Sequence, residues 1–171
     1  MAVLTPCRVQ ARLEAAGHRL PNPPLPRGSY APYSETKMVD GLLVCVSGQA
    51  SRQDGVPLPG ICLTDKDVPP ACFAAEQAML SGLAALRMAC GGDLNRVRLV
   101  SALRGYIRSG PDFECHSAVL DGASRILETA FPGMSRPART VVGVASLPGR
   151  CWVEVEMTAW VCGPKAGDRS G

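Results

Sequence analysis

Three charged side chains, Arg139, Glu154 and Glu156, lie in a stretch that otherwise favours β-structure, residues 137–156. A planar guanidinium can hold a carboxylate through two parallel hydrogen bonds, and charge-assisted bonds of this kind are strong. A carboxylic side chain in a partly dry cleft can move protons to and from a water molecule. These residue types therefore suit a binding site, whereas the simpler interpretation of their spacing is a solvated strand face with a surface cation.

The register of this segment decides which charges share a face. We expect a hairpin that reverses at residues 147–150, with one face of residues 152–160 apolar and Glu154 and Glu156 on the other. A simple turn places Arg139 opposite Thr158, on the same side as the glutamates and about 13 Å along the strand from Glu154. The three charges are thus predicted on the face that the helices leave open.

The elements that position this segment follow from periodicity. Val9, Leu13 and Ala16 predict a short first helix, capped at Thr5–Pro6 and stopped by Gly17. Four prolines between residues 21 and 26 predict an extended connector. The apolar run 41–48, bounded by glycines, predicts a central strand that is covered on both faces.

Two long helices are expected farther along the chain. Apolar residues recur at helical spacing over residues 74–90, and Gly91–Gly92 ends that helix. A second set over 119–130 stops before Pro132. Residues 96–108 between them read as a strand. The predicted fold is α+β, a mixed sheet with two long helices packed on one face.

An uncovered sheet face needs a partner. Val141, Trp152 and Trp160 fall on the predicted open face, so we expect oligomerisation, with charges at the edge of the seam lining a cleft between subunits.

Composition narrows the function classes. The net charge of +3 is spread over scattered basic residues, and aromatic residues make up 5% of the 171, so a nucleic-acid partner is not expected. No export signal or apolar stretch of membrane length is present, which favours a cytoplasmic protein with no membrane association. The eight cysteines form no C-x-x-C pair and there are two histidines, so we expect free thiols and no metal. Cys115 and His116 are neighbours in sequence and are not expected to face each other as a dyad.

Several motifs together resemble the RidA/YjgF family, small proteins described as translation inhibitors or endoribonuclease-like and best known for hydrolysing reactive enamines and imines. The resemblance covers about residues 28–161, and the Pro-Ala-Arg signature and the interval from Arg139 to Glu154 match together. The matching stretches are GSY at 28–30, LLVCVSGQ at 42–49, PDF at 111–113, LDGAS at 120–124, RPARTVVGVASLP at 136–148 and VEVE at 153–156.

The resemblance implies a chorismate-mutase-like homotrimer with sites between neighbouring subunits, acting on a small carboxylate-bearing substrate without a cofactor. We expect three parts of the chain: an N-terminal helix and proline-rich connector at 1–27, a RidA-like domain at 28–162 and a flexible tail at 163–171. The extra N-terminal helix resembles a longer branch of the family. By the same resemblance the site residues are Arg139 as carboxylate anchor, Glu154 as acid, and Tyr30, Gly48, Asp121 and Val141 as substrate-binding residues.

Three positions depart from the familiar deaminases of the family. Val141 stands where they carry a cysteine, and Asp121 stands where the better-known branch has asparagine. About four extra residues follow Tyr30, so Tyr33 is an alternative to it in the site.

Two functions follow as hypotheses. The first is hydrolysis of 2-imino or enamine acids to 2-oxo acids and ammonia. The alternative is a non-catalytic trimer that binds a carboxylate metabolite in the same cleft; ribonuclease activity is the less favoured third, since no histidine pair or clustered basic groove supports it.

Overall fold

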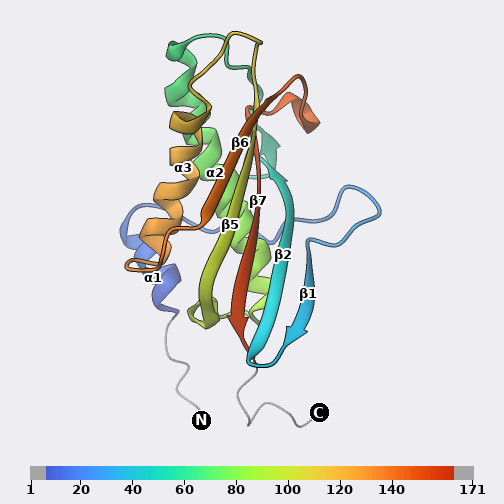
Figure 1. Cartoon of the computed structure of the whole chain (residues 1–171), viewed down its shortest axis with the longest axis vertical. Coiled ribbons are helices and arrows are strands. Elements are labelled where there is room, and N and C mark those ends of the chain that lie inside the picture. Colours follow the sequence, from blue (N-terminus) through green and yellow to red (C-terminus); the bar gives the residue numbers. More distant parts are fainter. Residues whose placement is uncertain (1–6, 164–171) are drawn as a thin grey trace.

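A five-stranded mixed sheet organises the chain, with strand order β1-β2-β7-β5-β6 and the helices on one of its faces (Figure 1). The computed structural model describes residues 7–163, so the tail predicted at 163–171 lies outside the described residues except for Gly163. The elements are α1 (Arg8–Ala15), β1 (Tyr33–Met38), β2 (Gly41–Ala50), β3 (Arg52–Gln53), β4 (Val56–Pro57), α2 (Val68–Ala89), β5 (Val97–Arg108), α3 (His116–Ala130), β6 (Ala138–Val144) and β7 (Val153–Cys162), with short 3-10 turns at Asp65–Asp67, Leu94–Arg96 and Pro148–Arg150. The α+β prediction with two long helices on one face is confirmed.

The first helix is present and packs on α3. Its buried residues are Val9 and Leu13, and Gly17 follows with a φ of +83°, a conformation that favours glycine. The N-cap is Cys7, and the cap predicted at Thr5–Pro6 lies outside the described residues. Arg12 Nη1 donates to the carbonyl of Ala130 at 3.2 Å, which satisfies a C-terminal carbonyl of α3. Residues 16–32 then contain no helix or strand, as the prolines predict.

The helix α2 begins six residues before the predicted start at residue 74. Pro69 and Pro70 lie in its first turn, where a missing N–H leaves no intrahelical bond unmade, so the prolines start the helix rather than delay it. Gly91 and Gly92 end it with φ values of +62° and +92°.

The strand β2 is not central, contrary to the prediction. Strand β7 occupies the middle of the sheet, and β2 lies between β1 and β7. Val44 and Val46 of β2 are buried under the helices, whereas Cys45 points to the other face and is exposed. The continuous apolar run therefore reflects a strand with one face on the core and a second face that the chain itself does not cover.

The predicted hairpin between β6 and β7 is wrong. Strand β6 pairs in parallel with β5, while β7 pairs antiparallel with β5 and β2, so β5 lies between them. The connection between β6 and β7 is longer than a tight turn, because the chain before β7 first pairs with residues 57–60. There the Trp152 N–H donates to the carbonyl of Leu58 at 3.1 Å. That detour carries the chain across the end of β5.

The changed pairing turns Arg139 to the other face. Leu103 of β5 is paired with both Arg139 and Met157, and Leu103 and Met157 are buried under the helices. Arg139 therefore points to the helix-covered side, whereas Glu154 points to the open side as predicted. The error for β6 therefore lies in its pairing partner: beside β5 instead of β7, the strand turns the other set of alternate residues to the helices.

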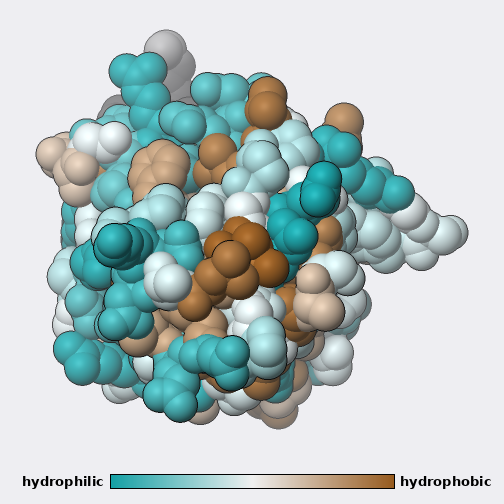
Figure 2. Space-filling model, turned by 90° about the horizontal axis from the view of Figure 1, so that it is seen from above, coloured by the Kyte–Doolittle hydropathy of each residue, from teal (hydrophilic) through white to brown (hydrophobic). Residues whose placement is uncertain are grey.

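Apolar side chains remain exposed at several places, including the open face of the sheet and the end that carries Leu63. The open face carries Val142 and Trp160, which are 45% and 40% exposed. A patch of apolar residues also lies near the middle of the end of the molecule that is seen from above in Figure 2. Leu63 lies at this end, 57% exposed and against Gly110. No helix within residues 7–163 has the length and apolar character to cross a membrane.

Close packing of α3 on α2 depends on Gly122. A Cβ at this position would collide with the carbonyl oxygen of Cys72, which is backbone and cannot move aside. In an exposed helix, Gly→Ala stabilises by about 1 kcal/mol. Here we predict that Gly122→Ala lowers the free energy of unfolding by about 1–3 kcal/mol through overpacking, measured by urea denaturation.

The matched control is Gly82→Ala in α2. Its added methyl group would lie 3.0 Å from Cε of Met157, the flexible end of a side chain, so we expect a smaller change, within about 1 kcal/mol. A Gly122→Ala protein as stable as Gly82→Ala would contradict the close helix contact.

Candidate functional site

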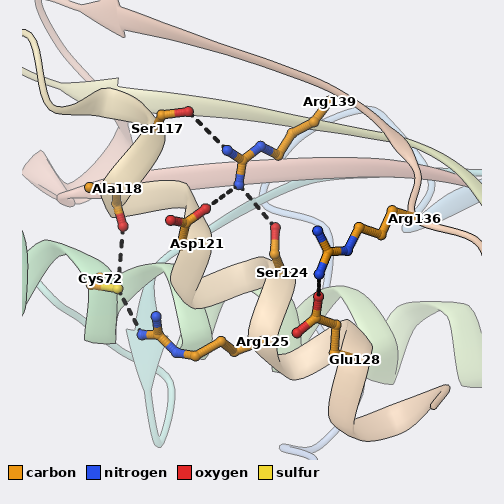
Figure 3. A network of polar contacts seen from close by, with 9 residues as sticks. All are labelled: Cys72, Ser117, Ala118, Asp121, Ser124, Arg125, Glu128, Arg136 and Arg139. Carbon is orange, nitrogen blue, oxygen red and sulfur yellow. Dashed lines mark hydrogen bonds and ion pairs between the residues drawn. The ribbon is translucent and has the colours of Figure 1, made fainter. Parts of the chain in front are cut away.

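Arg139 on β6 is held by a polar stripe on α3. Its Nη1 donates to Asp121 Oδ1 at 2.5 Å and to Ser124 Oγ at 3.1 Å, and its Nη2 donates to Ser117 Oγ at 2.9 Å. The spacing of four and three positions puts these three residues on one side of the helix. Figure 3 shows the guanidinium reaching from β6 onto this stripe. The Arg139 side chain nevertheless stays 28% exposed.

A groove of about 870 Å³ runs beside these contacts. Arg139, Asp121 and Ser124 line it, together with much of the loop 131–137 that leads from α3 to β6. Farther along the same stripe, Glu128 pairs with Arg136 at 3.2 Å. Three arginines line the groove. Arg136 and Arg139 are each paired with a carboxylate of α3 (Figure 3), and Arg125 is paired with Glu76 of α2.

A second set of contacts fixes α3 to α2. Arg125 Nη2 donates to Cys72 Sγ at 2.9 Å and to Glu76 Oε1 at 3.0 Å. The Cys72 thiol in turn donates to the carbonyl of Ala118 at 3.6 Å. These bonds hold the helix that carries the polar stripe, so the position of Arg139 depends on α2 as well.

Glu154 lies on the open face of the sheet, beside Gly48. The register of β2 shifts between Val46 and Gln49, so Gly48 sits in an irregular part of the strand. A Cβ at Gly48 would collide with the Glu154 carboxylate, so glycine leaves the room that this side chain occupies. Burial, and to a smaller extent the charge of Glu156, raises the pKa of Glu154 above its ordinary value. Glu154 therefore keeps its proton to higher pH than a solvated glutamate.

Two residues of β5 complete the polar cluster on the open face. Arg104 Nη1 pairs with Glu156 Oε1 at 3.1 Å, and Tyr106 lies directly across from Glu154 in the ladder. Burial, and then the charge of Glu156, raises the pKa of Tyr106. Sequence reasoning missed both residues, although the alternation of β5 places them on one face.

The two tyrosines left open by the sequence have different surroundings. Tyr33 begins β1 and packs against the hydrophobic core. Tyr30 is 52% exposed, and its hydroxyl accepts from the Arg27 N–H at 3.3 Å. The segment after Tyr30 is tied to the residue before Gly48, because Ser47 Oγ donates to the Ala31 carbonyl at 2.6 Å. This bond fixes the segment after Tyr30 beside the part of β2 that contains Gly48.

The predicted site residues fall into two groups within one chain. Arg139 and Asp121 are in contact on the helix side of the sheet. Val141 points to the same side and packs against the core. Gly48 and Glu154 are in contact on the open side. Strand β5 separates β6 from β7, so Arg139 and Glu154 point away from each other on opposite faces.

Cys115 and His116 have separate partners, as expected. The Cys115 thiol donates to Asp65 Oδ1 at 3.2 Å, while His116 Nε2 lies 3.2 Å from Ser109 Oγ with its ring edge-on to Phe113. Within residues 7–163, no group of three or more His, Cys, Asp or Glu side chains is arranged to hold a metal ion, and all eight cysteines are free thiols.

Comparisons with known proteins agree with this architecture. The sequence profile described as "Endoribonuclease L-PSP" matches residues 26–161. Protein TCP17 of Trypanosoma cruzi is 33% identical over 168 residues, which cover 91% of this chain and 96% of that protein. A putative endoribonuclease from Shewanella oneidensis has a similar crystal structure, with a TM-score of 0.80, 30% identity and coverage of 90% and 99%. The crystal structure of protein Atu1372 from Agrobacterium tumefaciens, of unknown function, matches with a TM-score of 0.75 and 33% identity. The match covers 90% of this chain and 92% of that one.

The raised pKa of Glu154 predicts a pH dependence of stability. The native state binds this proton more tightly than the unfolded state does, so the free energy of unfolding falls as pH rises from the ordinary value of 4.5 through the raised one. Glutamine cannot ionise. We predict that the melting temperature of Glu154→Gln, relative to the wild type, increases as pH rises through this window.

Thermal unfolding from pH 4 to pH 7 measures this difference. Glu128→Gln is the control for loss of a carboxylate, because its side chain is 55% exposed on α3. A Glu154→Gln difference that stays constant or shrinks with rising pH would contradict the buried carboxyl.

Proposed function

The chain belongs to the endoribonuclease L-PSP family, which is the RidA/YjgF family, and from this we propose that it hydrolyses 2-imino or enamine acids to 2-oxo acids and ammonia. The proposal places the reaction in clefts between the subunits of a homotrimer. The observation that carries it is the ordered guanidinium of Arg139, which lines a groove at the edge strand β6 and is still partly exposed.

Arg139 suits the role of carboxylate anchor. A guanidinium has five N–H donors, and within the described residues three oxygen atoms accept from it. N–H groups therefore remain for a ligand. Because three bonds already hold the side chain, little conformational entropy is lost when a substrate binds.

Glu154 suits the role of proton carrier. Hydrolysis converts C=NH2⁺ and H2O into C=O and NH4⁺. The attacking water passes one proton to the carboxylate, which returns it to the nitrogen, and the C–N bond breaks to release ammonia. The proton left on the carbonyl oxygen then passes to the ammonia, which gives C=O and NH4⁺. The raised pKa of Glu154 brings the carboxyl closer to the working pH, as proton transfer in both directions requires. The side chains in these roles need no cofactor.

The separation of the two residues supports a site between subunits. Arg139 and Glu154 lie on opposite faces of one sheet, so a single chain does not bring both to one substrate. The open face with Val142 and Trp160 offers apolar surface for a neighbouring chain to cover. In the proposed trimer, the edge strand β6 of one subunit meets the open face of the next.

Tyr30, Gly48 and Val141 are proposed as the walls of this cleft. Gly48 makes room for Glu154, and the exposed Tyr30 precedes a segment that is hydrogen-bonded to Ser47, next to Gly48. Val141 follows Arg139 on β6 with its side chain on the core, so its contribution would come from the backbone.

A non-catalytic trimer that binds a carboxylate metabolite is the second candidate. It is favoured by Val141, which offers no thiol, and by the ion pair that already engages Arg139. Ribonuclease activity is not proposed, because Arg104, Arg125, Arg136 and Arg139 are each paired with a carboxylate and leave no bare basic stripe among them.

Removal of the anchor tests the proposal. We predict that Arg139→Ala lowers kcat/KM for a 2-imino acid by about 100-fold or more, since two charge-assisted hydrogen bonds contribute about 1.5 kcal/mol each. The imine is generated in the assay from leucine by an amino-acid oxidase, and acceleration of ammonia release is measured.

The matched control is Arg136→Ala, three residues away in the same groove and 88% exposed, which we expect to keep most of the activity. A fully active Arg139→Ala protein would remove the proposed anchor. Binding of a 2-oxo acid by a wild type without hydrolysis would select the second candidate.

A further inference from the structure

Asp121 balances the positive charge of Arg139 in a groove that Arg125, Arg136 and Glu128 also line. Its Oδ1 accepts from Arg139 at 2.5 Å, and both residues line the same groove. The Asp121 side chain is 52% exposed, and within the described residues its Oδ2 has no hydrogen-bonding partner. An incoming ligand therefore meets a carboxylate as well as a guanidinium.

The presence of this carboxylate has unequal effects on different ligands. A purely anionic ligand on Arg139 would lie beside a second negative charge, and like charges at short distance repel. A ligand with a cationic nitrogen on the carbon next to its carboxylate would bring a positive charge and N–H donors to the free Oδ2. Such a ligand matches both members of the ion pair.

We propose that Asp121 selects the charge of the ligand, so that the site takes zwitterionic acids with an iminium or ammonium nitrogen beside the carboxylate and rejects the anionic 2-oxo acids. This inference rests on the proposed function, in which Arg139 holds the carboxylate. Selection by charge distinguishes the substrate from the product, because the 2-imino acid carries the cationic nitrogen and the 2-oxo acid has lost it as ammonia. Repulsion from Asp121 then favours product release.

Alanine and pyruvate test this selection with the full-length protein. They share a carbon skeleton and differ at the second carbon, where alanine carries an ammonium group that stands in for the short-lived iminium. Calorimetric titration at pH 7.5 is expected to give a dissociation constant at least about tenfold lower for alanine than for pyruvate. In Asp121→Asn, pyruvate is expected to bind more tightly and alanine more weakly, so that the ratio falls to about one or below.

The matched control is Glu128→Gln, which removes another α3 carboxylate from the same groove and is expected to leave the ratio unchanged. Asp121→Ser serves as a second variant if Asp121→Asn does not fold. Equal binding of the two ligands by the wild type, with a ratio that Asp121→Asn does not move, would overturn the selection. The carboxylate site would still stand in that case if Arg139→Ala abolished both bindings. The anchor and the selection would both fail if Arg139→Ala bound alanine and pyruvate as tightly as the wild type does. They would also both fail if the wild type bound neither ligand.

Discussion

The pairing of β6 with the outer edge of β5 is the constraint on which the site depends. Parallel pairing in this register points Arg139 at α3, where Asp121, Ser124 and Ser117 accept from it. The same pairing leaves β6 as the edge strand, so its outer backbone is available to a neighbour. A shift of one residue would turn the guanidinium to the open face and leave the polar stripe of α3 without its cation.

The proposed chemistry is divided between the two faces of the sheet. The helix face carries Arg139, the proposed anchor, whose charge is balanced by Asp121, and the open face carries Glu154, whose burial favours the protonated form. Each half is prepared before any ligand arrives: three hydrogen bonds hold the guanidinium, and the missing side chain of Gly48 makes room for the carboxyl. Because the side chains are already in place, the two halves need only to be brought together by neighbouring subunits, without rearrangement of either half. The proposed trimer supplies that assembly.

Local patterns in the sequence predicted the helices α2 and α3, the strand β5 and the buried face of β7, because their periodicity reports burial directly. The partner of β6 could not be predicted this way, since nearness in sequence suggested a hairpin and the detour after Pro148 leaves no periodic signal. Motif resemblance selected Arg139 and Glu154 as candidates, and the predicted hairpin register placed them on one face. Ser117 and Ser124 were missed because serines on a helix look like ordinary solvated residues; their spacing around Asp121 was the available signal. Arg104 and Tyr106 were missed because their partners lie on β7, which pairs with β5 at long range.

The central claim is that each site combines Arg139 of one subunit with Glu154 of another. Mixing Arg139→Ala with Glu154→Gln chains, after unfolding and joint refolding, tests it directly, because neither variant alone contains an intact site. If the site lies between subunits, random assembly leaves both residues intact in about a quarter of the clefts, and roughly a quarter of the wild-type imine hydrolysis should return. A mixture no more active than the separate variants would contradict the account.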